Sequence, residues 1–380
     1  MNLTYIGHAG WLFEDDNIKI LCDPWLDPDG AYFGGWFQFP LNDHLLETDV
    51  FEDITHLYIS HRHDDHFDKW FLDRLNKNVK VIIPKFKDKR LKNDVRKIGF
   101  KNIFELSEQD EIVEESFTLK IIPDEGYLDR DSALLIKTNK GAFLNLNDCH
   151  LPFELLKEKV GDIDVLLMQA SSAIWWPYSY EYNTETQRAH SKKKRTNVLK
   201  RALKYINILK TKTVIPNAGP PIFLNERFKE IIEDRGKDYN AFPMNDEVNN
   251  FFLENSINSF LMNPGDKVSY PCNKIKRYNY KIHPYNEYTE YVKMMRKKKE
   301  FMSDNYLIRK YNLTNEEINN VPFSFAMKIK EMQKKSKVFF DKLESVVLFK
   351  FSGLKEEVHV DFNCNPCVVG KKDSHDYEFI

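Results

Sequence analysis

Short apolar runs recur along the first 270 residues, separated by turn residues or by stretches of helical periodicity. β-branched and aromatic residues dominate these runs, which favours strands. Strands are expected at LTYI, WLFE, IKILC, HLYIS, KVIIP, FTLKIIP, ALLIKT, AFLNL, DVLLMQ, KTVIPN and NSFLM. Helices are expected at Lys69–Asn76, Leu151–Lys159, Gln187–Leu209, Phe223–Asp234 and Asn245–Glu254. This order of elements predicts an α/β architecture in which helices cover a sandwich of mixed sheets.

The composition changes after residue 270. Lys, Tyr, Met and Asn dominate as far as about residue 337, with helical periodicity in YTEYVKMMRKKKEFM and FSFAMKIKEMQKKS. A hairpin is expected in SVVLFKFSGLKEEVHVDFN and a last strand in HDYEFI. We therefore predict one domain over residues 1–270 and a small C-terminal α+β module, made of helices and a hairpin, over residues 271–380.

Composition and charge restrict the class of protein. With 380 residues, of which 42% are hydrophobic, the chain can bury a large core. Its 56 basic and 58 acidic residues create no overall field for an anionic partner, so neither nucleic acid nor a membrane is expected. No apolar run reaches the roughly 20 residues of a membrane helix and the start has no signal-like pattern, which predicts a cytoplasmic location. Five scattered cysteines fit a reducing compartment, and free thiols are favoured over a metal or redox site for CNPC.

The stretch YISHRHDDHFD, residues 58–68, concentrates potential metal ligands at the end of an expected strand. On an extended backbone His61 and His63 point the same way, so both can reach one ion. Asp65 and His66 follow the turn into the next helix and can reach a second ion. Imidazole and carboxylate together suit zinc, iron or manganese. Because a solvated polar turn does not account for four such residues in this order, the sequence predicts one or two divalent transition metals.

The order H-x-H-x-D-H after a short strand resembles the metallo-β-lactamase superfamily. The opening YIGHAGWLFEDDNIKILCDPWL is similar to the branch that contains ascorbate-phosphate lactonases, phospholipases D acting on N-acyl ethanolamine lipids, and CMP-N-acetylneuraminate hydroxylase. The pieces NLNDCHLP, NAGPPIFL and NPGD favour the last of these. The resemblance covers about residues 1–270 and implies an αββα sandwich that carries its metals at the edge of the two sheets.

Further site residues follow from this resemblance. Asp148 matches the carboxylate that bridges two metals, with an ordinary turn aspartate as the alternative. His8 matches a histidine near the metals that contacts substrate or a metal-bound oxygen, and a purely structural role in the turn is equally open. Asp23 would orient a ligand histidine or cap the turn before Pro24.

Two histidines of the superfamily pattern are missing. The position of the first aligns with Tyr127, close to Asp124, Glu125 and Asp129, and the last is absent from PNAGPP. A site with fewer imidazoles and more carboxylates is harder, which moves the preference from zinc towards iron or manganese.

Two aromatic segments, AYFGGWFQFP and IWWPYSYEY, are broken by Gly and Pro and are expected as loops near the metals. Trp36, Trp175 and Trp176 are candidates to stack on a base or sugar, while a hydrophobic lid packed on the core is the alternative. The helix after the second segment carries HSKKKRTNVLKR, in which Lys193 and Arg195 are candidates to hold a phosphate unless the run is only a solvated face.

The first functional expectation is a metal-dependent hydrolase that acts on a phosphorylated or nucleotide-linked sugar-like small molecule, with Asp65 or His8 as the group that handles protons. The alternative is an iron-dependent monooxygenase resembling CMP-N-acetylneuraminate hydroxylase. That chemistry takes electrons from a Rieske centre, whose Cys-x-His ligand pairs are absent here, so a separate electron-transfer protein or a portion missing from this sequence would supply them. A non-catalytic scaffold ranks last, because the ligand residues named above are present.

Overall fold

The computed structural model describes residues 1–114, 116–124, 131–172, 174, 176–178, 180, 182–224, 231, 233–298, 314–335, 346–351, 357–362, 368–370 and 377–379. The chain divides into two compact units, Met1–Phe301 and Met302–Ile380. This division lies on the C-terminal side of the boundary near residue 270 that the composition predicts.

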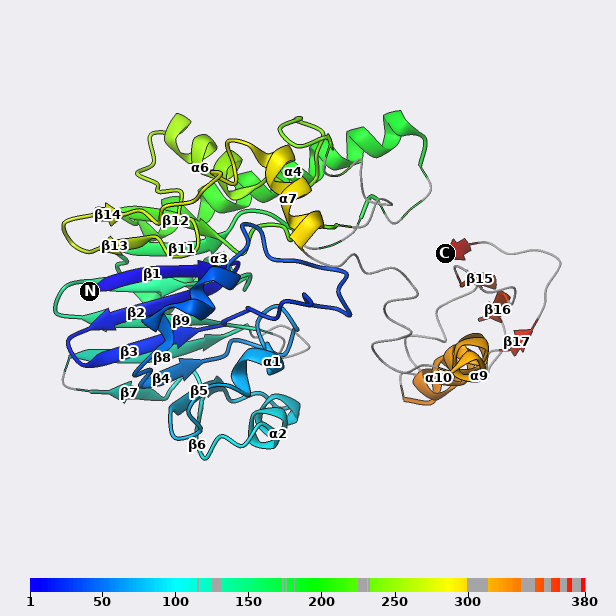
Figure 1. Cartoon of the computed structure of the whole chain (residues 1–380), viewed down its shortest axis with the longest axis horizontal. Helices are drawn as coiled ribbons and strands as arrows, with labels where there is room; N and C mark the ends of the chain where they lie inside the picture. The colour runs from blue at the N-terminus through cyan, green and yellow to red at the C-terminus, as the bar shows by residue number, and fades with distance from the viewer. Residues whose placement is uncertain are drawn as a thin grey trace. The chain divides into compact units, whose positions relative to one another are not determined.

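Two sheets pack face to face in the first unit (Figure 1). The larger sheet has the strand order β14-β13-β1-β2-β3-β4-β5-β6. Its strands are β1 Asn2–Gly7, β2 Gly10–Asp15, β3 Ile18–Cys22, β4 His56–Tyr58, β5 Lys80–Pro84, β6 Asn102–Leu106, β13 Lys267–Ser269 and β14 Lys274–Lys276. The second sheet has the order β12-β11-β10-β9-β8-β7. Its strands are β7 Glu111–Val113, β8 Phe117–Pro123, β9 Ser132–Thr138, β10 Ala142–Asn145, β11 Val165–Gln169 and β12 Thr213–Asn217.

Apolar side chains on both faces of the strands explain why the sequence shows continuous apolar runs. In β2, Trp11 and Phe13 are buried in the core between the sheets, whereas Leu12 belongs to the core on the outer face. Successive residues of a strand point to opposite faces, so a strand that is covered on both sides needs apolar residues at every position. The predicted mixed-sheet sandwich is confirmed.

Helices cover both outer faces of the sandwich (Figure 1). The larger sheet is covered by α1 Lys69–Leu72 and α2 Arg90–Lys97, and the 3₁₀ helices η1 Asp43–Glu47 and η2 Asp49–Phe51 lie in the connection from β3 to β4. The second sheet is covered by α3 Phe153–Val160, α4 Thr184–Leu209 and α6 Asn245–Glu254. The helix predicted over residues 245–254 is therefore confirmed, and most of the one predicted over residues 223–234 lies outside the described residues. The strand predicted at NSFLM is wrong, because Ser259 makes only an isolated bridge with Val214.

Residues 271–298 belong to the first unit. The strand β14 extends the larger sheet through β13, and α7 spans Tyr288–Lys298. The ring of Phe39 packs against Tyr285, Tyr288 and Tyr291 at centroid distances of 5.1, 5.1 and 5.5 Å. The hydroxyl of Tyr291 accepts a hydrogen bond from the backbone N–H of Leu41 at 2.6 Å. These contacts explain why the division falls later than the change in composition.

The second unit contains helices and a small sheet. Its described elements are α9 Asn315–Asn319, α10 Val321–Lys335, β15 Val346–Lys350, β16 Glu357–Asp361, β17 Val368–Gly370 and β18 Tyr377–Phe379. The strands β15 and β16 pair antiparallel, which confirms the predicted hairpin, and β18 confirms the strand predicted at HDYEFI. Ala326 of α10 packs with Val347, Val358 and Val360 in a separate small core.

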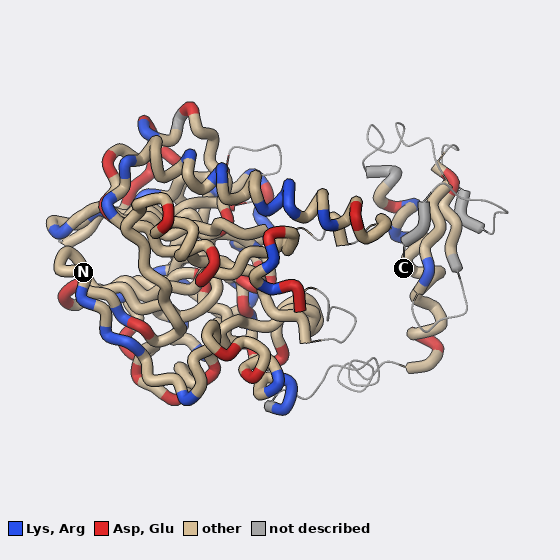
Figure 2. The backbone as a smooth tube through the Cα atoms, turned by 90° about the horizontal axis from the view of Figure 1, so that it is seen from above, with Lys and Arg blue, Asp and Glu red and all other residues tan. Residues whose placement is uncertain are grey.

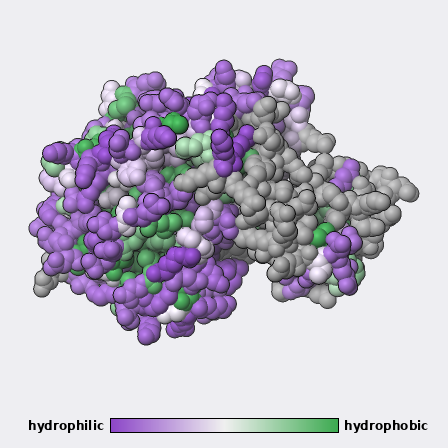
Figure 3. Space-filling view, viewed as in Figure 1, coloured by the Kyte–Doolittle hydropathy of each residue, from purple (hydrophilic) through white to green (hydrophobic). Residues whose placement is uncertain are grey.

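Charged residues of both signs are distributed along the described part of the first unit (Figure 2). The visible face of this unit is predominantly hydrophilic (Figure 3). Among the described helices, none combines the length and the apolarity that crossing a bilayer requires.

Candidate metal centre

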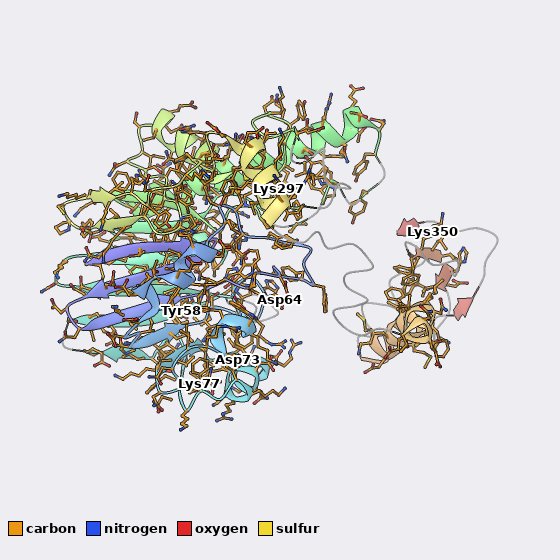
Figure 4. The ribbon with its side chains drawn as sticks, viewed as in Figure 1. Tyr58, Asp64, Asp73, Lys77, Lys297 and Lys350 are labelled. Carbon is orange, nitrogen blue, oxygen red and sulfur yellow. The ribbon has the colours of Figure 1, made fainter. Side chains whose placement is uncertain are left out.

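The candidate centre lies where β4 ends. This strand runs parallel to β3 on one side and to β5 on the other, and in Figure 4 Tyr58 lies in the sheet while Asp64 lies beyond its end. Asp68 then begins α1, accepting the backbone N–H of Phe71 at 3.0 Å. Its other oxygen accepts the backbone N–H groups of Leu26 and Asp27, both at 2.7 Å. The ligand-rich loop is thereby fastened at both ends.

His61 and His63 converge as predicted, although not on a strand. The strand stops at Tyr58, so both histidines lie in the loop that follows. Their rings are 4.4 Å apart between centroids, and Nε2 of His61 lies 2.7 Å from Nδ1 of His63. Two imidazole nitrogens that face each other this closely can bind one cation.

His66 faces two carboxylates with a nitrogen that has no hydrogen-bond partner among the described residues. The side chain is fully buried, and its Nε2 lies 3.7 Å from Oδ2 of Asp65 and 3.6 Å from Oδ1 of Asp148. That oxygen of Asp148 is also buried without a described partner. Buried polar atoms left unsatisfied are costly. Nitrogen and oxygen atoms that converge in this way fit a divalent metal, which the residues present would hold.

Two buried carboxylates contact the imidazoles of His66 and His61, which are candidate metal ligands. Asp23 lies 3.0 Å from Nδ1 of His66, and it accepts the backbone N–H and the hydroxyl of Ser60 at 2.8 and 2.6 Å. Asp131 lies 3.2 Å from Nδ1 of His61. A carboxylate on Nδ1 places the proton there and leaves Nε2 free to bind a metal. The role expected of Asp23 beside a ligand histidine agrees with this contact.

Asp131 is a site residue that the sequence reasoning missed. It stands directly before β9, whose antiparallel partner β10 leads to Asp148. The pairing of Asn145 with Leu134 brings the ends of these two strands together, and this register was the signal that could have found it. Burial raises the pKa of the Asp131 carboxyl, and the charge of Asp148 raises it further.

The region of the first missing histidine is only partly described. Tyr127, Glu125 and Asp129 lie outside the described residues, and Asp124 donates its backbone N–H to the carbonyl of Asp131 at 2.9 Å.

His8 serves both the turn and the site. It adopts a left-handed backbone with φ of 48° between β1 and β2. Its carbonyl accepts hydrogen bonds from the Tyr5 hydroxyl at 3.0 Å and from the Ala218 N–H at 2.8 Å. Its Nε2 lies 3.0 Å from Oδ2 of Asp65. His8 therefore has a structural role in the turn and contacts a candidate ligand, while its predicted contact with substrate or a metal-bound oxygen stays a prediction.

The electrostatics of the site favour a positive charge among its carboxylates. Burial disfavours the charged form of His66, yet Asp148 and Asp65 outweigh it and raise the pKa of this imidazole well above its ordinary value. Burial likewise opposes ionisation of Asp65, but His66 and His8 lower the pKa of its carboxyl. A metal ion held by Nε2 of His66 and these carboxylates would supply the same positive charge in place of the proton.

Of the three tryptophans predicted to stack on a substrate, the two that the structure describes are buried or half-buried. Trp36 is buried, and its ring lies 4.6 Å from that of Tyr32 and 6.4 Å from that of Phe223. This packing fits the alternative, a hydrophobic lid on the core, better than an exposed stacking surface. Trp176 is half-buried with its ring 5.1 Å from His190. Trp175 lies outside the described residues.

The basic helix α4 also differs from the prediction in part. Arg195 lies 3.6 Å from Glu247 of α6, so a carboxylate already faces its guanidinium. Lys193 is exposed and stays a candidate. The buried cation of this helix is Lys194, which donates to the carbonyls of Ile174 and Trp176 and so fastens the second aromatic segment.

The family is decided by a match over more than half of the chain. Residues 2–218 match the beta-lactamase superfamily domain. The chain belongs to the beta-lactamase superfamily. This assignment confirms the resemblance drawn from the H-x-H-x-D-H motif.

Relatives of this superfamily member carry different names. It is 35% identical over 253 residues to a "Putative Rieske 2Fe-2S iron-sulfur protein" of Mycolicibacterium smegmatis, a match that covers 64% of this chain and 48% of the relative. It is 24% identical over 216 residues, 51% of this chain and 39% of the relative, to the 4-amino-L-phenylalanyl-[CmlP-peptidyl-carrier-protein] 3-hydroxylase of Streptomyces venezuelae. The crystal structure of "a possible metal-dependent hydrolase" from Veillonella parvula matches with a TM-score of 0.51 and 15% identity, covering 70% of this chain and 98% of that one. The chain thus spans about half the length of the first relative, and the solved structure shows the fold.

Proposed function

We propose that this superfamily member is a metal-dependent hydrolase whose centre is formed by His61, His63, Asp65, His66 and Asp148. The observation that carries the proposal is the buried Nε2 of His66, which faces two carboxylates beside the converging nitrogens of His61 and His63. A divalent metal bound there would polarise a scissile carbonyl or phosphoryl oxygen and lower the pKa of a water molecule.

The protein's own residues position this centre and move protons. Asp23 and Asp131 hold the imidazoles of His66 and His61 in orientation. His8 and Asp65 share a hydrogen bond of 3.0 Å, the separation at which a proton can pass between them or to a bound substrate. We assign proton handling to this pair.

The substrate class we propose is a phosphorylated or nucleotide-linked sugar-like small molecule. Its support is the basic run of α4, in which Lys193 offers an exposed ammonium group. The test is inhibition of a hydrolytic assay by nucleotide sugars in the parent protein and in the variant Lys193→Ala. Equal inhibition of both proteins argues against contact between Lys193 and a phosphate.

The second candidate is an iron-dependent oxygenase. It is favoured by two relatives, one named as a hydroxylase and the other as an iron-sulfur protein. The centre has fewer imidazoles than the superfamily pattern, because two histidines of that pattern are missing, and a larger share of carboxylate suits iron. In this case electrons would come from a separate protein or from a portion outside this sequence, because the cysteines and histidines present do not form the ligand pairs of a Rieske centre.

One measurement separates the two candidates. The protein is purified without oxygen and its metals are counted by mass spectrometry. Zinc or manganese supports hydrolysis, whereas iron without zinc supports oxygenation. Failure to bind any of these metals after reconstitution rejects both functions.

A further inference from the structure

The loop of Ala31–Trp36 has an unusual backbone beside the candidate centre. Ala31 and Trp36 close it with two hydrogen bonds between their backbones, at 2.9 and 3.2 Å. Between them Tyr32 and Phe33 have φ values of 52° and 57° and Gly34 has 77°. Left-handed conformations are unfavourable for large side chains such as tyrosine and phenylalanine. They persist where surrounding contacts fix them, and they gather at functional sites.

Burial of its tip does not hold this loop in place. Phe33 is 74% exposed, so burial of its ring contributes little to the stability of the loop. Other residues of the loop make its contacts with the rest of the protein: Trp36 packs with Phe223, and the backbone N–H of Tyr32 donates to Asp64 in the ligand-rich loop after β4.

Tyr32 contacts three neighbouring residues of that ligand-rich loop. Its backbone N–H donates to Oδ2 of Asp64 at 3.2 Å, and its hydroxyl donates to Oδ1 of Asp65 at 2.8 Å. Its ring meets that of His63 edge-on, with 6.4 Å between centroids. The hydroxyl is not needed for the ring packing against Trp36, so its contact with Asp65 calls for a separate explanation.

We propose that Tyr32 is a positioning residue of the metal centre, which sets the orientation of the Asp65 carboxylate. His8 holds Oδ2 of this carboxylate and Tyr32 holds Oδ1, so donors from two separate loops clamp a single side chain. A clamped carboxylate presents a defined oxygen to a metal, and loss of such a contact weakens metal binding. The inference rests on the proposed metal function and names a residue that the H-x-H-x-D-H motif does not contain.

The test compares Tyr32→Phe with Tyr180→Phe in the full chain. The first variant keeps the ring and removes only the hydroxyl. The second removes the same atom from a tyrosine that is 52% exposed. Three quantities are measured: Co(II) affinity by competition with a chelator, the visible absorption spectrum of the Co(II) protein, and the melting temperature of the metal-free protein.

We expect Tyr32→Phe to bind Co(II) about tenfold more weakly and with an altered spectrum, while the metal-free melting temperature stays that of the parent. Tyr180→Phe should match the parent in all three measurements. If Tyr32→Phe matches the parent in affinity and spectrum, the role of Tyr32 is rejected and the metal function stands. If the parent itself binds no metal, both proposals fail. If affinity and melting temperature fall together with an unchanged spectrum, Tyr32 is structural and the proposal is rejected.

Discussion

The two halves of the candidate centre are assembled in opposite ways. On the side of the larger sheet, His61, His63, Asp65 and His66 come from one loop after β4. On the side of the second sheet, the carboxylates stand at the facing ends of two strands, β9 and β10. A contiguous set of ligands can be read from the sequence, whereas a set assembled by strand pairing needs the register. The predictions below test whether the two halves also differ in what they contribute.

Loss of the imidazole pair should have the largest effect. The double variant His61→Ala, His63→Ala removes two nitrogens that converge within 2.7 Å, so we expect most of the bound metal to be lost. Metal per chain is measured by mass spectrometry. His190→Ala, which removes a half-buried imidazole that packs against Trp176, is the control and should keep its metal. Unchanged metal in the double variant would refute the ligand assignment.

On the carboxylate side, Asp131→Asn should have a smaller effect, because Asp131 orients a ligand. We expect metal affinity to fall by roughly 10- to 100-fold, the usual result when the partner of a ligand histidine is lost. Competition with a chelator measures it, with Asp53→Asn at an exposed turn as the control. Complete loss of metal would show instead that Asp131 is itself a ligand, and parent affinity would show that its contact with His61 has no role.

Two buried charged side chains also bind backbone groups, one beside the imidazole loop and one on the helix α4. Asp68 accepts the N–H groups of Leu26, Asp27 and Phe71 beside the imidazole loop. Lys194 donates to two carbonyls of the aromatic segment that follows β11. The two anchors should differ in their contribution to stability and in their response to pH.

Asp68 should contribute more to the free energy of unfolding than Lys194. Asp68→Asn replaces one acceptor oxygen by an amino group and leaves buried N–H groups without a partner, which costs about 1–3 kcal/mol of the free energy of unfolding. Urea unfolding of the metal-free protein measures this loss. Asp73→Asn, at the exposed end of the same short helix, should change stability little. Equal effects of both substitutions would contradict the anchoring role.

The contribution of Lys194 to the free energy of unfolding should depend on pH. Burial lowers the pKa of Lys194 to about 8 from 10.5. Between these values the unfolded chain holds a proton that the folded chain has released, so the contribution of this group to the free energy of unfolding rises with pH. Relative to Lys194→Met, the parent should gain about 1 kcal/mol from pH 7 to pH 9. Denaturation curves that keep a constant difference between the two proteins would show an ordinary pKa for Lys194.

The sandwich and one half of the centre could be predicted from the sequence because their determinants are local. Apolar runs identify strands covered on both faces, and the ligand-rich loop can be recognised from a few consecutive residues. Asp131 could not be found in this way, because a single aspartate before a strand gains meaning only from the strand that pairs with it. The choice between a stacking surface and a packed lid for Trp36 stayed open for a related reason: Phe223, against which its ring packs, lies far away along the chain.

The packing of Phe39 against three tyrosines has a practical consequence for dissecting this protein. The superfamily match ends at residue 218, yet β13 pairs with β1, and Tyr285, Tyr288 and Tyr291 cover Phe39. A truncation at residue 218 would leave β1 with an open edge and a bare aromatic ring, both of which promote aggregation. A shortened chain intended to keep the metal centre should therefore extend through α7.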